Sequence, residues 1–69
     1  MGRYKLVRKH EVEHHNRYYE LRMNNNAEHP YSLFFITDEE NLEEIAAEIR
    51  QNEAPNNDDW TIIPHRKDE

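Results

Sequence analysis

Apolar positions in one segment of the chain follow the spacing of an α-helix. They fall at i, i+3, i+4 and i+7, at Leu42, Ile45, Ala46 and Ile49. This spacing predicts a helix over 38–52 with the apolar stripe buried. Thr37 followed by Glu40 fits a capping box at its start. Pro55 is expected to stop the helix soon after it ends.

Other segments show the patterns of strands. Residues 31–37 are dense in aromatic and branched side chains without helical spacing, which predicts a well-covered, central strand. Residues 18–23 alternate between apolar and polar side chains and predict a half-buried strand. The asparagines and the proline within 24–30 indicate a turn. Residues 60–64 predict a short final strand, and we expect 65–69 to be a frayed charged tail.

The N-terminal segment, 3–12, fits two structures. Its apolar residues indicate a strand, whereas the spacing of Lys9, Glu13 and Arg17 would support ion pairs along a helix. We favour the strand. The resulting order β-β-β-α-β predicts one small α+β domain over 1–69, with a mostly antiparallel sheet that starts as a hairpin or meander, and one helix packed on one face. Which face the helix covers stays open.

Charge is unevenly distributed along the chain. The formal net charge is -6, but residues 1–24 carry a local balance of +3 and the remainder carries -9. A negative net charge disfavours general binding to nucleic acid or anionic membranes. The uneven distribution fits equally well with a basic sheet edge that lies beside an acidic helix in the same molecule.

Composition narrows the cellular setting. The chain has no cysteine, which excludes disulfides and thiolate zinc sites. No apolar run approaches the ~20 residues that a membrane helix needs, and the N-terminus lacks the apolar stretch of a secretion signal. We therefore expect a cytoplasmic protein without a cofactor.

One motif suggests metal chemistry. His10, Glu11 and His14 match the H-E-x-x-H spacing of zinc hydrolases, in the run H-E-V-E-H. On a strand, however, positions i and i+4 lie about 13 Å apart, too far for one metal ion. A chain this short also leaves little room for a substrate groove, and Ser32 lacks the exposed turn of a hydrolase nucleophile. A zinc hydrolase is thus our third interpretation, and we expect no enzyme and no metal site.

The outer face of the predicted helix is the first candidate binding surface. Its carboxylates are Glu39, Glu40, Glu43, Glu44 and Glu48. Each like-charged i, i+4 pair costs about 0.2 to 0.5 kcal/mol, and no basic residue within the helix is placed to relieve it. We interpret these residues as a surface for a basic partner, with solubility as the simpler explanation.

The sheet face away from the helix is the second candidate surface. Neighbouring residues of a strand point to opposite faces, and one helix can cover only one of them. We expect Phe34 and Ile36, together with Tyr18, Val7 and Ile63, to form an apolar patch for a partner or a second copy of the chain. The alternative is that chain ends or long basic side chains fold over this patch.

These observations predict a small acidic protein-binding module that acts on a basic macromolecular partner. We expect a stoichiometric inhibitor or adaptor of the kind that phages and other mobile elements encode, and in one form of this hypothesis its carboxylates imitate nucleic acid. A homodimer through the sheet face belongs to the same expectation. The alternative is a nucleic-acid-binding domain that uses a basic N-terminal hairpin. Its contact residues would be Arg3, Lys5, Arg8, Lys9, Arg17, Arg22 and Tyr18.

Overall fold

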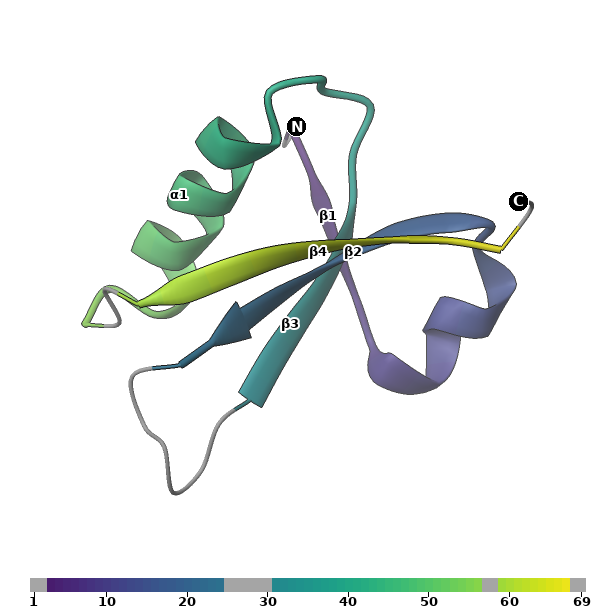
Figure 1. Cartoon of the computed structure of the whole chain (residues 1–69), viewed down its shortest axis with the longest axis horizontal. Coiled ribbons are helices and arrows are strands. Elements are labelled where there is room, and N and C mark those ends of the chain that lie inside the picture. Colours follow the sequence, from purple (N-terminus) through teal and green to yellow (C-terminus); the bar gives the residue numbers. More distant parts are fainter. Residues whose placement is uncertain (1–2, 25–30, 57–58, 68–69) are drawn as a thin grey trace.

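The protein forms a four-stranded sheet with one α-helix packed against it, as Figure 1 shows. The computed structural model describes residues 3–24, 31–56 and 59–67. In chain order the elements are β1 (Lys5–Val7), the 3-10 helix η1 (Lys9–His14), β2 (Arg17–Met23), β3 (Tyr31–Ile36), α1 (Leu42–Glu53) and β4 (Trp60–Arg66). The strands lie in the order β1-β3-β2-β4, and all neighbours are antiparallel. The predicted α+β class is confirmed.

The core lies between α1 and one face of the sheet. Its fully buried large side chains are Leu21, Met23, Phe35, Ile45 and Ile49. The predicted helical stripe is confirmed, because Ile45, Ala46 and Ile49 are buried and Leu42 is half-buried. The helix therefore covers the sheet face that carries Phe35. Phe34 and Ile36 consequently lie on the opposite face, which we call the far face.

β3 occupies an interior position, as predicted. The strand pairing at the N-terminus, however, differs from the prediction. β1 pairs with β3, not with β2, so the predicted N-terminal hairpin is wrong. β1 and β2 run parallel with β3 between them, and the chain from Arg8 to Asn16 has to cross β3 to join them. Figure 1 shows η1 and α1 on opposite sides of the strands. The apolar run of β3 fits an interior position, because side chains on both faces of an interior strand pack against those of the strands on either side.

The prediction of a strand over 3–12 is correct only for β1. Lys9–His14 forms η1, whose bonds include Glu11 N donating to Arg8 O at 2.8 Å and His15 N donating to Val12 O at 3.1 Å. Val12 is the only apolar residue between Arg8 and Asn16. A strand needs alternating apolar positions to bury one face, and this segment has none to offer.

α1 begins at Leu42, four residues after the predicted start. Asn41 caps the helix, because its Oδ1 accepts a hydrogen bond from Glu44 N at 3.2 Å. The predicted cap at Thr37 is wrong: its hydroxyl donates to Arg3 O at 2.6 Å and accepts from Glu39 N at 3.1 Å. The helix ends at Glu53, within one residue of the prediction. No helix in the described part of the chain is long and apolar enough to cross a membrane.

β4 is longer than predicted. His65 and Arg66, expected in a frayed tail, belong to the strand and pair with Tyr18 and Arg17 of β2. Among the described strands, β4 pairs with β2 alone and is an edge strand, where Pro64 is tolerated because its missing N–H faces no partner strand. The end of the predicted tail, 68–69, and most of the predicted turn, 25–30, lie outside the described residues.

Candidate functional site

The H-E-V-E-H run lies on η1 and is largely exposed. A 3-10 helix has about three residues per turn, so His10 and His14, four positions apart, point in directions about 120° apart. The zinc motif instead requires two imidazoles on one face of an α-helix. Within the described residues, no group of three or more histidine or acidic side chains could hold a metal ion. The residues of η1 therefore do not fit a zinc centre.

A polar cluster lies on the far face, across three strands. Glu20 on β2 accepts hydrogen bonds from Ser32 Oγ on β3 at 2.6 Å and from Arg22 Nη2 at 3.3 Å. His65 Nε2 on β4 lies 3.0 Å from the other oxygen of the same carboxylate. Only 12% of the Glu20 side chain is exposed. Sequence reasoning missed this cluster, although a single carboxylate between Tyr18 and Arg22 on a strand face was a signal for it.

The cluster sets the charge state of Glu20. Burial disfavours the charged carboxylate and is the strongest single influence, but the hydrogen bonds from Ser32, His65 and Arg22 together outweigh it and lower the pKa of Glu20 below its usual value. The carboxylate stands between the serine and the histidine. Because His65 does not contact Ser32 Oγ, it is not placed to remove a proton from that hydroxyl, as the base of a hydrolase triad must.

Apolar side chains surround this cluster. The Tyr18 ring stacks on the His65 ring with centroids 4.6 Å apart, and it meets the Phe34 ring edge to face at 6.1 Å. Lys67 Nζ lies 5.9 Å from the Tyr18 centroid. The five residues predicted for the far face do share it, and each is half-buried: Val7, Tyr18, Phe34, Ile36 and Ile63.

The predicted carboxylate row lies partly on α1 and partly before it. We call Glu39, Glu40, Glu43, Glu44 and Glu48 the acidic surface. Glu39 and Glu40 precede the helix, which corrects the prediction of one continuous helical row. Arg3 from the N-terminal segment contacts Glu39 at 3.0 Å, Glu48 at 3.4 Å and also Glu44. The hydrogen bonds that Arg3 donates to Glu39 and Glu44 are the main reason that the pKa of Arg3 is raised.

Arg3 thus relieves part of the repulsion that no residue within the helix could relieve. Glu40 and Glu43 make no ion pair with a residue that the structure describes. The alternative expectation was that a basic edge of the sheet lies beside the acidic helix. The contacts of Arg3 with the acidic surface agree with it. This expectation does not account for the rest of the acidic surface.

The basic residues of the alternative nucleic-acid interface fall into separate groups. Arg3, Lys5 and Arg17 line one hollow of about 350 Å³, and Arg8 and Lys9 line another. Arg3 contacts the acidic surface, and Arg22 contacts Glu20. Lys5 lies on the edge strand β1, and Arg17 lies at the start of β2 opposite Arg66. Arg8 and Lys9 lie beyond the end of β1. These residues do not form a basic hairpin, because β1 and β2 are not paired.

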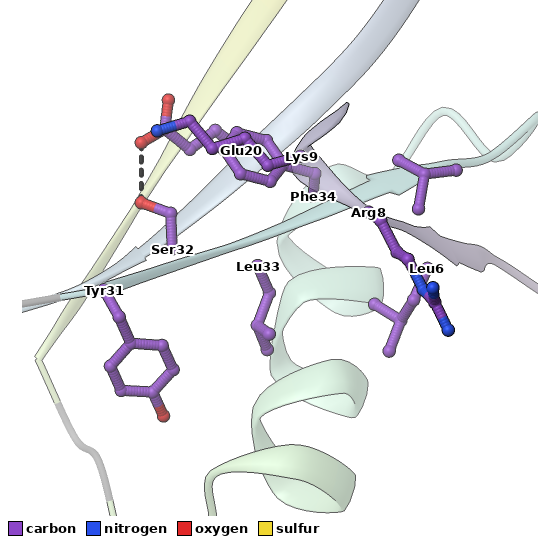
Figure 2. Close-up of a pocket in the computed structure, with 9 residues that line it drawn as sticks. Leu6, Arg8, Lys9, Glu20, Tyr31, Ser32, Leu33 and Phe34 are labelled. Carbon is purple, nitrogen blue, oxygen red and sulfur yellow. Dashed lines mark hydrogen bonds between the residues drawn. The ribbon is translucent and has the colours of Figure 1, made fainter. Parts of the chain in front are cut away.

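Arg8 and Lys9 line a hollow at the edge of β3, of about 550 Å³, which we call the β3-edge hollow. Figure 2 shows Leu6, Tyr31 and Leu33 pointing from the strands toward the α1 side of this hollow, while Ser32 and Glu20 lie on the other side. The sequence did not predict it, because it depends on β1 pairing with β3 and ending early.

Comparison with family models, with curated proteins and with solved structures finds no match to this chain.

Proposed function

We propose that the chain is a protein-binding module whose acidic surface meets a basic surface of a partner protein. The observation that supports this proposal is the concentration of five carboxylates on and just before α1. Among the described basic residues, Arg3 alone forms ion pairs with them, while Arg17 and Arg66 line a hollow beside Glu39 and Glu40. Together Arg3 and the five carboxylates keep a net charge of -4. Such a surface attracts a basic partner and speeds their association.

Arg3 has a second effect that supports binding. By contacting Glu39, Glu44 and Glu48 at once, it holds three long side chains in one arrangement. Side chains that are already ordered lose less conformational entropy when a partner binds. Glu40 and Glu43, which no described residue contacts as an ion pair, then supply the charge that the partner neutralises.

Within this function, a stoichiometric inhibitor or adaptor is the form we favour, and the partner class is a protein whose basic groove binds nucleic acid. This step rests on analogy between a row of carboxylates and a row of phosphates. Direct binding of nucleic acid by this chain has less support, because two of the proposed contact residues, Arg3 and Arg22, already contact carboxylates of the protein itself.

Charge reversal on the acidic surface tests the proposal. Proteins captured from a host lysate by the wild-type chain would be identified by mass spectrometry, purified and titrated against two double variants. Glu40→Lys with Glu43→Lys should weaken binding about tenfold or more, and rising salt should weaken wild-type binding. The matched control, Glu11→Lys with Glu13→Lys, makes the same change of charge on exposed positions of η1 and should bind like the wild type.

Two results would contradict the proposal. One is equal affinity of both double variants for the purified partner. The other is tight, salt-sensitive binding of generic DNA or RNA by the wild-type chain, which would favour the nucleic-acid alternative.

A further inference from the structure

β3 is an interior strand, but one of its edges is only half covered. On one side, β2 pairs with it from Tyr19↔Phe35 to Met23↔Tyr31. On the other side, β1 pairs with Ile36, Phe35 and Phe34 and stops at Val7. The chain then turns into η1, so β1 cannot continue. Residues 31–33 therefore face no strand of the described chain along their outer edge.

Unpaired strand edges offer backbone hydrogen-bonding groups to another chain. In an antiparallel strand, alternate residues direct their N–H and C=O groups to the same edge. The bonds from Asn24 N to Asp59 O and from Lys67 N to Asn16 O extend the β2–β4 ladder and fix this alternation. Tyr31 and Leu33 therefore direct their backbone groups to β2, and Ser32 directs its N–H and C=O groups to the outer edge. An extended peptide that continued the line of β1 would reach these groups.

The side chains beside this edge are suited to an apolar residue. Leu6 and Tyr31 are 36% and 47% exposed, and Leu33 between them is half-buried. They line the same side of the β3-edge hollow (Figure 2). Its volume of about 550 Å³ lies within the range of about 300 to 1,000 Å³ that is usual for binding pockets.

The charges around the hollow select an acidic ligand. Arg8 and Lys9 line it, and neither makes an ion pair with a residue that the structure describes. The carboxylate of Glu20, which also lines the hollow, is engaged by Ser32, His65 and Arg22. Cationic side chains that line an apolar hollow favour a peptide that carries a carboxylate.

The same charges disfavour a second copy of this chain as the occupant. Two copies that paired edge to edge through β1 would bring Lys5, Arg8 and Lys9 of one protomer close to the same residues of its partner. Like charges placed opposite each other across a strand pair are destabilising.

We propose that the outer edge of β3 at residues 31–33 binds an extended acidic peptide of another protein, which adds to the sheet as a strand in line with β1. Backbone hydrogen bonds supply affinity, an apolar side chain fills the space beside Leu6, Tyr31 and Leu33, and a carboxylate meets Arg8 and Lys9. This site is independent of the acidic surface. It requires an acidic ligand, whereas the acidic surface requires a basic one.

The experiment uses the full chain and three labelled peptides of equal length. The first alternates valine and threonine and carries a glutamate at each end; the second carries lysine in place of glutamate; the third is the first with alternate backbone amides N-methylated. Fluorescence anisotropy should show that the acidic peptide binds about tenfold or more tightly than the other two, because only it offers both the carboxylates and the backbone donors. Amide hydrogen exchange at Ser32, whose N–H faces the outer edge, should slow when it binds.

Protein variants locate the site. Arg8→Glu should weaken binding of the acidic peptide by about tenfold, and Tyr31→Ala should weaken it as well. The control, Arg17→Glu, makes the same change of charge at the opposite end of the sheet and should leave binding unchanged.

Three results with the peptides would overturn the proposal. They are failure of the acidic peptide to bind, equal binding of the N-methylated peptide, and binding that Arg8→Glu leaves unaltered. If raising the concentration of the protein alone protects the same amides, a second copy occupies the edge, and the proposal of an acidic peptide is wrong.

Discussion

Among single residues, Glu20 and Arg3 both bring opposite charges together, but at different depths. Glu20 is largely covered and engages three polar side chains within the sheet face, where reduced access of water strengthens each hydrogen bond. Arg3 lies at the surface with 40% of its side chain exposed, so water and salt screen its ion pairs. Glu20 should therefore matter for stability, and Arg3 for the arrangement of the acidic surface.

Replacing Glu20 tests its contribution to stability. The folded pKa of Glu20 lies below its usual value, so the stabilisation is fully present above the unfolded pKa of about 4.5 and is lost as the pH falls through the lower folded pKa. Glu20→Gln should reduce the free energy of unfolding at neutral pH by about 1 to 2 kcal/mol. It should also make the remaining stability less dependent on pH below about 5.

Urea unfolding, followed by the fluorescence of Trp60, would measure both effects. The control is Glu13→Gln, which removes an exposed carboxylate from η1 and should leave the free energy of unfolding at neutral pH nearly unchanged. A Glu20→Gln variant that loses stability with acid as steeply as the wild type would show that the cluster does not contribute in this way.

At the scale of elements, periodic segments were predictable and segments that depend on distant contacts were not. The stripe of α1 and the alternation of β2 identified both elements because each buries one face. The start of α1 was not predictable, since Thr37 and Asn41 each precede a glutamate by three residues. A contact of Thr37 with the backbone of Arg3, 34 positions away, accounts for the choice of Asn41.

The candidate surfaces were likewise predictable where they depend on local periodicity, and not where they depend on distant contacts. Strand alternation alone was enough to gather Phe34, Ile36 and their neighbours on one face. The contacts of Arg3 with Glu48, and of His65 with Glu20, each join residues 45 positions apart. Such contacts follow from the strand order, and the pairing of β1 with β3 left no local pattern in the sequence.

The cap of α1 is testable. Asn41→Ala removes the acceptor of the Glu44 N–H and should lower the free energy of unfolding by about 1 kcal/mol. Glu40→Ala, one position earlier and outside the helix, should leave helix content and stability nearly unchanged. Circular dichroism during thermal unfolding would compare them, and a larger loss from Glu40→Ala would place the cap elsewhere.

At the scale of the whole molecule, three surfaces surround one small core: the acidic surface beside α1, the far face, and the β3-edge hollow. The far face is apolar around the carboxylate of Glu20, which also lines the β3-edge hollow and whose hydrogen-bond donors are already in place. If a partner covered Glu20 further, its charge would still be paired within the protein. An unpaired buried charge is the usual obstacle to burying an acidic group in an interface. The far face is thus suited to self-association.

We predict a homodimer through the far face. A stable interface needs about 800 Å² from each partner, a modest share of the 5186 Å² that the protein exposes. Ile63→Lys would place a charge among the half-buried apolar side chains of this face without touching the core against α1. It should convert the dimer to a monomer with an unchanged circular dichroism spectrum. Ala47→Lys adds the same charge on the exposed side of α1 and should remain dimeric. Sedimentation equilibrium over a range of concentrations would decide, and a wild-type chain that stays monomeric throughout would show that the far face does not bind a second copy.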